Sequence, residues 1–584
     1  MKIRYIGAFM LLWLVFTGCK KDAVAPQTPG GTPAATKLSI QTDQARYHPG
    51  QEVLFTINPS APTGAMVRYK YLNSVVGESG LNGSSWQWTP PADDFKGYMA
   101  EVYQKVDGQE QILASIGIDV SSNWTKFPRY GFLSKFPDMS EQSVGAVIDN
   151  LNRYHINGLQ FYDWHYKHHQ PLAGTPQNPV PIYQDIINRD IYFATIQKYI
   201  DAAHSRNIEA MQYNLVFGAL DNAAQAGVAA EWYLYKDANR DSKDKHPLPQ
   251  PPFISDIFLL NPANPAWQQY LAGENKKVYE ALPFDGFHMD QLGNRNTPLY
   301  TWEGASVDLA ATYQPLIEAV KAAAPEKYHV MNAVSQYGQE GIAQAPTDFL
   351  YTEVWSPYDG FADLGNIIKD NNTFSNNTKN TVLAAYMNYD LANNAGYFNT
   401  PAVLLTDAVI FAFGGAHLEL GEHMLGKEYF PNSNLSMKED LKKALTNYYD
   451  FMVAYQNLLR DGGTFNNPPI SNFGQISLNQ WPPQLGQVSV VGKRVGNRQV
   501  IHLLNFTNAT TLNWRDNTGT QAYPQAVKDV GLNLTADGQV RKLWFASPDF
   551  NGGASTELPF TQTGNRVTFT LPSLQFWDMI VVEY

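Results

Sequence analysis

Short apolar runs alternate with amphipathic, helix-length segments through the middle of the chain, from about residue 129 to residue 461. A short apolar run that ends in a polar or turn residue is typical of a strand buried in a parallel sheet. We identify eight such runs, at residues 130–133, 158–164, 208–215, 284–290, 328–334, 349–355, 381–388 and 414–421. Helical periodicity fills the gaps, for example over residues 140–154, 191–204, 267–281, 309–323 and 437–459.

Eight strand–helix units in succession predict a (β/α)8 TIM barrel over residues 122–461. The connections after the second and third runs, residues 167–190 and 221–262, are long and rich in Pro, His, Asp and Asn. Loops at the C-terminal ends of barrel strands build substrate clefts, so we expect these two connections to form cleft walls.

The flanking segments have a different pattern, with a period of two broken by turn residues. Residues 37–121 predict an N-terminal immunoglobulin-like β-sandwich, which either binds sugar through Trp86 and Trp88 or is a spacer packed on the next domain. Residues 462–584 predict a C-terminal antiparallel β-sandwich. The expected fold is therefore multidomain, with a central barrel between two β-sandwiches.

The first 36 residues predict export. Residues 1–18 have a basic start, an apolar core and a small-residue end, as in a signal peptide. The small residues before Cys19 resemble a lipobox, which predicts lipidation of Cys19 and a flexible tether over residues 19–36; the alternative is an ordinary signal peptide with an incidental cysteine. We therefore expect a secreted lipoprotein anchored in the outer membrane, facing the cell surface or the periplasm, with its lipid anchor as the membrane contact.

Charge and motif content narrow the function classes. The chain carries 42 Lys and Arg against 54 Asp and Glu, a net charge of −12, and no basic run follows the N-terminus, so nucleic-acid binding is not expected. Its one cysteine excludes a disulfide within the chain. No phosphate-binding loop, dinucleotide fingerprint or serine-hydrolase elbow is present, and no cofactor is predicted.

Two carboxylates end strand-like runs at the same expected face of the barrel. Asp290 ends the run 284–290, and Glu353 lies near the end of the run 349–355. Hydrolysis of a glycosidic bond uses two such groups, about 5–5.5 Å apart when the configuration is retained and about 6.5–9.5 Å apart when it is inverted. The alternative is that either group is structural, in an ion pair or a helix cap.

Further polar and aromatic residues near the strand ends are candidates for substrate binding, although any of them can instead be a satisfied polar group in the core. They are Tyr162, Asp163, Trp164, His165, Asn214, His288, Gln291, Trp355, Asn388 and Glu419. His165, His168 and His169 raise the question of a metal, but neighbouring histidines do not converge easily on one ion, and no metal is predicted.

Taken as a set, five motifs resemble glycoside hydrolase family 66, the family of endo-dextranases and cycloisomaltooligosaccharide glucanotransferases. They occur at residues 119–134, 160–165, 285–293, 351–355 and 428–431. The resemblance implies Asp290 as the nucleophile, Glu353 as the acid/base and Asp163 as a glucose-binding residue. It also implies retaining endo-hydrolysis of α-1,6-linked glucan (dextran) to isomaltooligosaccharides.

The cyclising members of that family carry a large carbohydrate-binding insertion in the barrel, and the chain has no spare hundred residues for it, which favours a plain dextranase. The segment 421–428 is also shorter than the family's version. Alternatives are a transglycosylase that forms linear or cyclic isomaltooligosaccharides, a hydrolase of another linkage, and a non-catalytic surface lipoprotein that binds glycan.

Overall fold

The computed structural model describes residues 38–584. The predicted signal peptide, Cys19 and the tether lie outside the described residues. Within residues 38–584, none of the helices is both long enough and apolar enough to span a bilayer.

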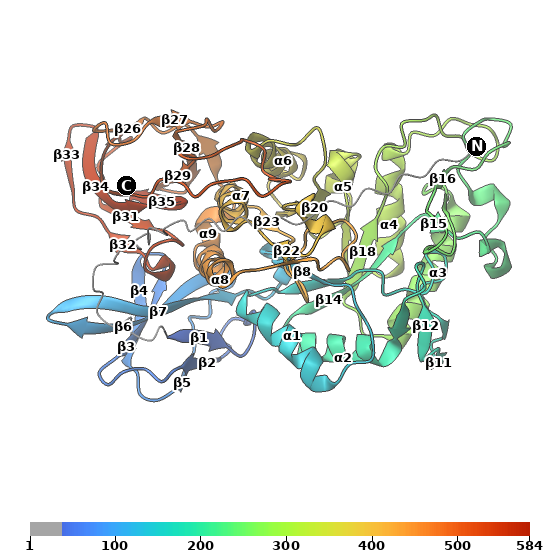
Figure 1. Ribbon diagram of the computed structural model, residues 1–584, viewed down its shortest axis with the longest axis horizontal. Coiled ribbons are helices and arrows are strands. Elements are labelled where there is room, and N and C mark those ends of the chain that lie inside the picture. Colours follow the sequence, from blue (N-terminus) through green and yellow to red (C-terminus); the bar gives the residue numbers. More distant parts are fainter. Residues whose placement is uncertain (1–37) are drawn as a thin grey trace, which may run out of the picture. The chain divides into compact units, whose positions relative to one another are not determined.

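Eight parallel strands form a closed ring, in the order in which they occur in the chain. Figure 1 shows several of them in the middle of the molecule, with helices beside them. Neighbouring strands pair in two arcs, from β8 to β19 and from β20 to β23. Single parallel bridges join the arcs, Asn332↔Tyr351 on one side and Phe132↔Gly421 on the other. The strands are β8 (Tyr130–Leu133), β9 (Gly158–Phe161), β14 (Glu209–Leu215), β18 (Gly286–Asp290), β19 (Tyr328–Met331), β20 (Leu350–Glu353), β21 (Thr381–Ala384) and β23 (Ala416–His417), and each falls within one of the eight apolar runs.

Helices connect successive strands of the ring, and two more follow the last strand. In α1 (Glu141–Arg153), the Ser140 side chain caps the first turn, and Val144, Ile148 and Leu151 form the buried face. The helix α7 (Thr400–Ala412) is buried along its whole length, which explains its lack of a polar face. The others are α2 (Phe193–His204), α3 (Pro265–Ala281), α4 (Tyr313–Ala323), α5 (Gln339–Gln344), α6 (Phe361–Phe374), α8 (Glu439–Ala454) and α9 (Gln456–Leu459).

Two sheets with a common core form the N-terminal region. One is β1 (Ser39–Thr42), β2 (Val53–Asn58) and β5 (Ser85–Trp88); the other is β4 (Ser74–Gly80), β3 (Met66–Tyr71), β6 (Lys96–Val106) and β7 (Gln109–Val120). Trp86 stacks on Phe55 with ring centroids 4.8 Å apart, and Trp88 stacks on Tyr69 at 4.1 Å. One face of each indole is thus taken up by packing, which favours the spacer interpretation over sugar binding.

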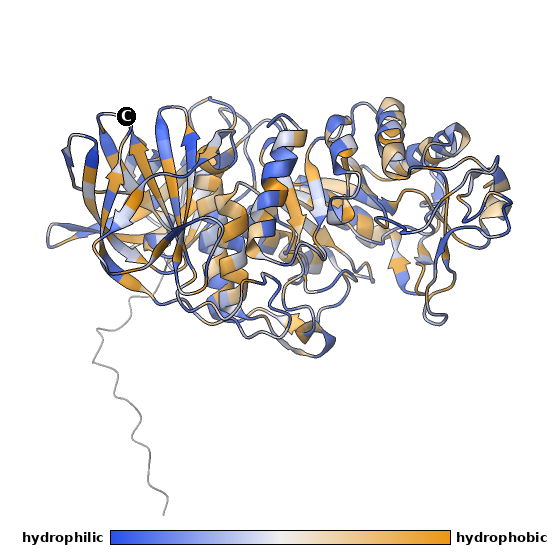
Figure 2. Ribbon diagram, turned by 90° about the horizontal axis from the view of Figure 1, so that it is seen from above, coloured by the Kyte–Doolittle hydropathy of each residue, from blue (hydrophilic) through white to orange (hydrophobic). Residues whose placement is uncertain are grey.

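The C-terminal region also has two antiparallel sheets that share a core. Along β34 most residues alternate between buried and more exposed positions, and Figure 2 shows the mixture of hydrophobic and hydrophilic residues on these strands. One sheet contains β25 (Thr464–Asn466), β28 (Val488–Val495), β29 (Arg498–Asn505), β35 (Trp577–Glu583), β31 (Lys542–Ala546), β32 (Thr556–Glu557) and β27 (Leu478–Gln480); the other contains β26 (Ile470–Asn472), β30 (Val527–Thr535), β34 (Arg566–Leu574) and β33 (Phe560–Thr563).

Short strand pairs stiffen the loops around the ring. The connection after β14 folds into a three-stranded sheet, and the connection after β9 contains two small hairpins. These strands are β10 (Gly174–Thr175), β11 (Asn178–Pro179), β12 (Ile182–Gln184), β13 (Asp190–Tyr192), β15 (Gly218–Ala219), β16 (Lys245–His246), β17 (Ile257–Leu259), β22 (Gly396–Tyr397) and β24 (Leu435–Ser436).

Trp124 packs against the N-terminal ends of several ring strands. Its indole is fully buried and contacts the rings of Tyr130, Tyr328 and Phe349, with centroids 5.9, 5.8 and 5.2 Å away. Gly158 at the start of β9 faces the same indole, and a Cβ atom there would lie 2.3 Å from Trp124 Cζ3. The first position of β9 therefore requires glycine for reasons of space.

We expect Gly158→Ala to lower the free energy of unfolding by about 1–3 kcal/mol, because the added methyl group must displace the buried indole. Gly145→Ala is the matched control, since a methyl group on this helical glycine would meet no atom within 4 Å and should add about 0.5–1 kcal/mol. Denaturant unfolding of both variants and the parent checks this. Equal midpoints for Gly158→Ala and the parent would contradict the packing argument.

Candidate active site

A cleft with a cavity volume of about 390 Å³ opens at the C-terminal ends of the ring strands. This is the end of a parallel α/β ring at which catalytic groups gather. Polar residues line its floor and apolar residues line much of its wall. The lining residues are Gln160, Tyr162, Asp163, His168, Ile186, Tyr213, Leu215, His246, Leu248, Phe253, Ile257, His288, Asp290, Gln291, Leu292, Asn332, Val334, Tyr351, Glu353, Tyr386, Glu428, Tyr429 and Phe430.

The two candidate carboxylates share one hydrogen-bond donor. Asp290 ends β18 and Glu353 ends β20, and Asn332 lies directly after β19, between them. Asn332 Nδ2 donates to Asp290 Oδ1 at 2.9 Å and to Glu353 Oε2 at 3.0 Å. Because the two N–H bonds of an amide diverge by about 120°, linear bonds of these lengths place the two carboxylate oxygens about 5 Å apart.

Asp290 is held by three donors. Besides Asn332, the Tyr213 hydroxyl donates to Oδ2 at 2.5 Å, and the Gln291 backbone N–H donates to Oδ1 at 2.8 Å. Burial raises the pKa of Asp290, and these three hydrogen bonds oppose the rise because they favour the charged form. The arrangement thus favours an ionised carboxylate in a buried position.

Glu353 is the more proton-retaining member of the pair. It accepts from Asn332 and from the Tyr386 hydroxyl, the latter at 2.8 Å to Oε1. Burial, and then the neighbouring charge of Asp290, raise the pKa of Glu353 to about 7. Near neutral pH this side chain is therefore able both to donate and to accept a proton.

Asp163 is a third carboxyl group at the cleft floor. It follows β9 with a left-handed backbone, φ +50°, which turns the chain sharply at the end of the strand. Burial raises the pKa of Asp163 to about 7, Arg189 opposes the rise, and Asp185 and Asp290 add to it. Asp163 is thus available in the cleft for contact with substrate hydroxyl groups.

Two loops contribute residues to the walls of the cleft. Leu248, Phe253 and Ile257 come from the connection after β14, one of the two long loops that the sequence predicts as a cleft wall. Tyr429 and Phe430 come from the motif at 428–431. Phe430 stacks on Tyr162 with ring centroids 4.2 Å apart and an interplanar angle of 9°, so one face of the Tyr162 ring is fixed by packing.

Six of the predicted residues come together in the cleft, and the others lie behind it. The six are Tyr162, Asp163, His288, Asp290, Gln291 and Glu353. Trp164 is fully buried and packs on Phe284, so it supports the end of β9 and has no surface for a sugar. His165 Nε2 contacts His168 Nδ1, and Trp355 packs against Tyr386; neither His165 nor Trp355 is part of the cleft lining.

The prediction for strand β14 chose the wrong face. Asn214 is fully buried, donates to the His168 carbonyl and contacts His168 Nδ1. In the parallel register Tyr213 pairs with His288, so both side chains point toward the cleft while Asn214 points away. The sequence alone does not indicate which residue faces the cleft, because the strand continues to Leu215 and its end is therefore one residue beyond Asn214.

Asn388 and Glu419 are also structural. Asn388 binds the C-terminal domain through the Asp516 backbone carbonyl, at 2.7 Å. Glu419 lies in a buried cluster with Asp407, His417 and Tyr449, away from the cleft lining. The cleft residues that sequence reasoning misses include Tyr213, Asn332, Tyr351 and Tyr386; all four lie inside predicted strand runs, and none carries a charge that would mark it.

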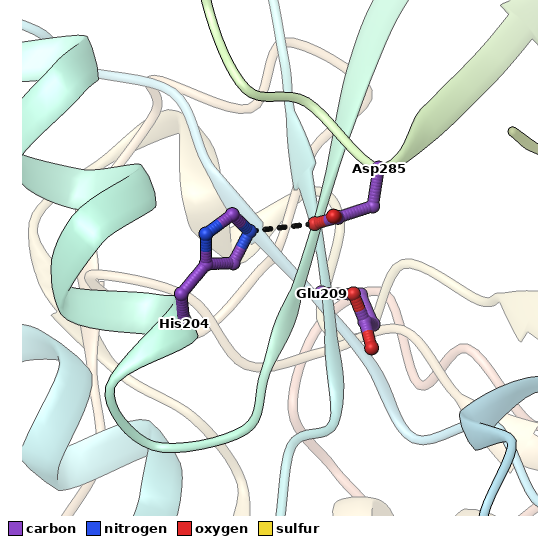
Figure 3. A group of neighbouring side chains, drawn as sticks. All are labelled: His204, Glu209 and Asp285. Carbon is purple, nitrogen blue, oxygen red and sulfur yellow. Dashed lines mark hydrogen bonds and ion pairs between the residues drawn. The ribbon is translucent and has the colours of Figure 1, made fainter.

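Two groups of side chains have the composition of a metal site among the described residues. Figure 3 shows the first, in which His204 Nε2 binds Asp285 Oδ2 at 2.8 Å beside Glu209. Arg46 of the N-terminal region pairs with Glu209 at 2.9 Å and supplies the positive charge there. The second group is Asp407, His417 and Glu419. His417 Nδ1 lies 2.8 Å from Asp407 Oδ1, which is a hydrogen-bond distance. Neither group touches the cleft lining.

Cleavage of a glycosidic bond uses two carboxyl groups, and the cleft holds two at the ends of β18 and β20, on either side of β19. The ring and its site together define a glycoside hydrolase. The chain belongs to glycosyl hydrolase family 66, whose family model matches residues 42–581.

Similar proteins are consistent with membership of this family. A cycloisomaltooligosaccharide glucanotransferase from Niallia circulans is 27% identical over an alignment that covers 100% of this chain and 76% of that protein. A dextranase from Streptococcus salivarius is 25% identical over 80% of this chain and 65% of its own length. The crystal structure of a cycloisomaltooligosaccharide glucanotransferase from Paenibacillus sp., complexed with cycloisomaltoheptaose, is 26% identical, with a TM-score of 0.85, covering 93% of this chain and 99% of that one.

We expect Asn332→Ala to lower kcat/KM on the enzyme's glucan substrate by roughly 10²-fold or more, the usual cost of losing one preorganised donor. Because the amide lowers the pKa of both carboxyl groups, its loss should move both limbs of the pH–activity profile to higher pH. Asn371→Ala, which removes a buried asparagine bonded to Thr381, is the control for lost core packing. An unchanged profile in Asn332→Ala would contradict the bridging role.

Proposed function

We propose that the protein cleaves α-1,6-linked glucan, the linkage of dextran, by a retaining double displacement that releases isomaltooligosaccharides. The observation that supports this most directly is that one nitrogen, Asn332 Nδ2, donates to Asp290 Oδ1 at 2.9 Å and to Glu353 Oε2 at 3.0 Å, which for linear bonds corresponds to an oxygen–oxygen separation of about 5 Å. Retaining enzymes place their two carboxyl groups about 5–5.5 Å apart, whereas inverting enzymes leave room for a water molecule at about 6.5–9.5 Å.

In the first step Asp290 attacks the anomeric carbon while Glu353 protonates the departing O6 oxygen. The bond from C1 to that oxygen breaks as an ester forms between C1 and Asp290, with inversion at C1. The pKa of Glu353, raised to about 7, keeps the proton on the acid at mildly acidic pH. The donors on Asp290 keep the nucleophile ionised.

In the second step Glu353, now ionised, removes a proton from an incoming hydroxyl group. Its oxygen attacks C1, the ester bond to Asp290 breaks, and a second inversion restores the α configuration. Water as the acceptor completes hydrolysis; a sugar hydroxyl completes transglycosylation. Both outcomes use the same two side chains.

The substrate assignment is supported by the relatives. Two are named cycloisomaltooligosaccharide glucanotransferases and one a dextranase, and the solved relative holds an isomalto-oligosaccharide ring. We take the closed ring of strands and its flanking sheets to be the (β/α)8 barrel and β-sandwiches expected from the sequence.

Hydrolysis and transglycosylation remain the two candidate outcomes. The two Niallia circulans relatives, at 27% identity, favour transfer. The length of the chain favours hydrolysis: the alignment with the first relative runs over 743 positions, and the 584 residues of this chain leave well over a hundred of them without a counterpart. We propose hydrolysis as the main activity, with transglycosylation as the alternative.

Asp290→Asn and Glu353→Gln should each lower kcat/KM on dextran by several orders of magnitude, because each removes one half of the pair. In the parent enzyme activity should fall as pH rises through about 7, since Glu353 must hold a proton for the first step and its raised pKa keeps that proton up to this value. Glu422→Gln, a buried carboxyl group bonded to Ser134, is the control. Near-parent dextran activity in either catalytic variant would exclude the assignment.

The product profile tests the function itself. We expect proton NMR of a dextran digest to show α-configured reducing ends forming first and mutarotating later, which is the result of retention. Chromatography over time should show linear isomaltooligosaccharides; cyclic products would instead identify the transglycosylase, and first-formed β ends would exclude the retaining mechanism. Starch and pullulan, incubated in parallel, test the linkage.

A further inference from the structure

One loop of the C-terminal domain, residues 511–521, docks against the ends of β20 and β21. It is joined to the ring region by backbone hydrogen bonds, from Phe361 N to Leu512 O at 2.9 Å and from Asn388 N to Arg515 O at 2.8 Å. The Thr406 hydroxyl on α7 also donates to Trp514 O, at 3.2 Å. The loop is thus part of the structure that surrounds the active site.

Arg515 in this loop binds both backbone segments that hold Glu353 in place. Its Nη2 donates to the Val354 carbonyl at 2.7 Å, and its Nη1 donates to the Tyr386 carbonyl at 3.2 Å. Val354 directly follows Glu353 in the chain, and Tyr386 is the residue whose hydroxyl binds Glu353 Oε1. One planar guanidinium therefore links the residue after the acid/base to the residue that donates to it.

The guanidinium is a buried cation without an adjacent carboxylate among residues 38–584. Arg515 is 7% exposed, its acceptors are two carbonyl groups, and it lies over the rings of Trp355, Tyr389 and Trp514 at 4.8, 5.5 and 4.5 Å. Burying such a charge is costly, and a neutral amide would suffice to join two domains through two carbonyls. At longer range the charge of Arg515 interacts favourably with those of Asp359 and, more weakly, Glu353.

We propose that Arg515 is a positioning residue for the acid/base carboxylate, supplied to the active site by the C-terminal domain. The proposal rests on the proposed function of Glu353. Arg515 fixes the ends of β20 and β21, so that the carboxyl group of Glu353 lies within proton-transfer distance of the departing oxygen. Its positive charge favours the ionised form of Glu353, which is the form required in the second step.

This role has a chemical signature. Cleavage of dextran expels a sugar alkoxide, which needs protonation, whereas an aryl isomaltooligoside expels 4-nitrophenolate, which does not. A misplaced acid should therefore reduce kcat/KM on dextran much more than on the aryl substrate. General damage to the fold should reduce both equally.

The test compares Arg515→Met and Arg515→Lys with the parent on dextran and on a 4-nitrophenyl α-isomaltooligoside. Arg515→Met should lose about tenfold or more of kcat/KM on dextran and much less on the aryl substrate.

The basic limb of the pH–activity profile of Arg515→Met should move to higher pH, because the loss of a positive charge raises the pKa of Glu353. The titratable groups that interact with Glu353 are Asp290, Tyr162, Tyr351, Tyr386 and Arg515, and the other four remain in place. Arg515→Lys should keep the limb near the parent's and still lose activity on dextran.

Thr406→Val is the matched control, because it removes one hydrogen bond between the same loop and α7 without touching Arg515. Equal losses on both substrates, or a Thr406→Val profile that matches Arg515→Met, would overturn the positioning role. Should Arg515→Met fail to fold by circular dichroism, Arg515→Lys decides by its substrate ratio. Glu353→Gln separates the two hypotheses: if it keeps dextran activity, the proposed function fails, and if it discriminates between the substrates while the Arg515 variants do not, this inference alone fails.

Discussion

Two carboxyl groups held about 5 Å apart in a buried cleft repel one another when both are charged, and the structure around them has to contain that repulsion. The side-chain amide of Asn332 offsets much of this repulsion, because it donates one N–H to each carboxyl group. Its own oxygen accepts from the Glu353 backbone at 3.1 Å, and Gln291 donates to its backbone carbonyl at 3.0 Å, so the amide cannot rotate away. The remaining asymmetry favours the proton on Glu353, because burial and the charge of Asp290 raise the pKa of Glu353 to about 7 whereas three hydrogen bonds favour the ionised form of Asp290.

Asn332 also lies at one of the two junctions where a single bridge closes the ring of strands. The pairing between β19 and β20 is a single bridge, Asn332↔Tyr351, whereas the pairs within each arc involve between two and five residues of each strand. A seam of this kind leaves the strand ends free to separate, and the hydrogen bonds of the Asn332 side chain cross it. The contact between Arg515 and the ends of β20 and β21 supports the far side of the same seam. The closure of the ring and the geometry of the carboxyl pair therefore depend on the same few residues.

The sequence was sufficient for the strands and the carboxyl pair, because both have strong local signals. An apolar run of four to eight residues bounded by turn residues is typical of a buried strand, and a charged residue at its end is easily recognised. The sequence was not sufficient to predict which residues contact the carboxyl pair. Sequence reasoning predicts Asn214 and misses Tyr213, because the residue that faces the cleft depends on parallel register, a property of two strands that are far apart in the chain. Asn388 was assigned to substrate when its partner, Asp516, lies more than a hundred residues later in another domain.

In the proposed mechanism, hydrolysis or transfer of the covalent intermediate depends on what occupies the space beside it, since Glu353 would activate any hydroxyl group that reaches C1. Water reaches an open polar site freely, whereas an apolar wall disfavours water and offers surface to the pyranose face of a sugar. The cleft contains both kinds of surface: the apolar residues Leu248, Phe253 and Ile257, and a floor of carboxyl and tyrosyl groups. The loop that carries the apolar residues is long and packs on its own small sheet, so it can vary without disturbing the ring. In the proposed mechanism, substitutions in this wall can therefore change the balance between hydrolysis and transfer while the carboxyl pair, its bridging amide and Arg515 stay the same.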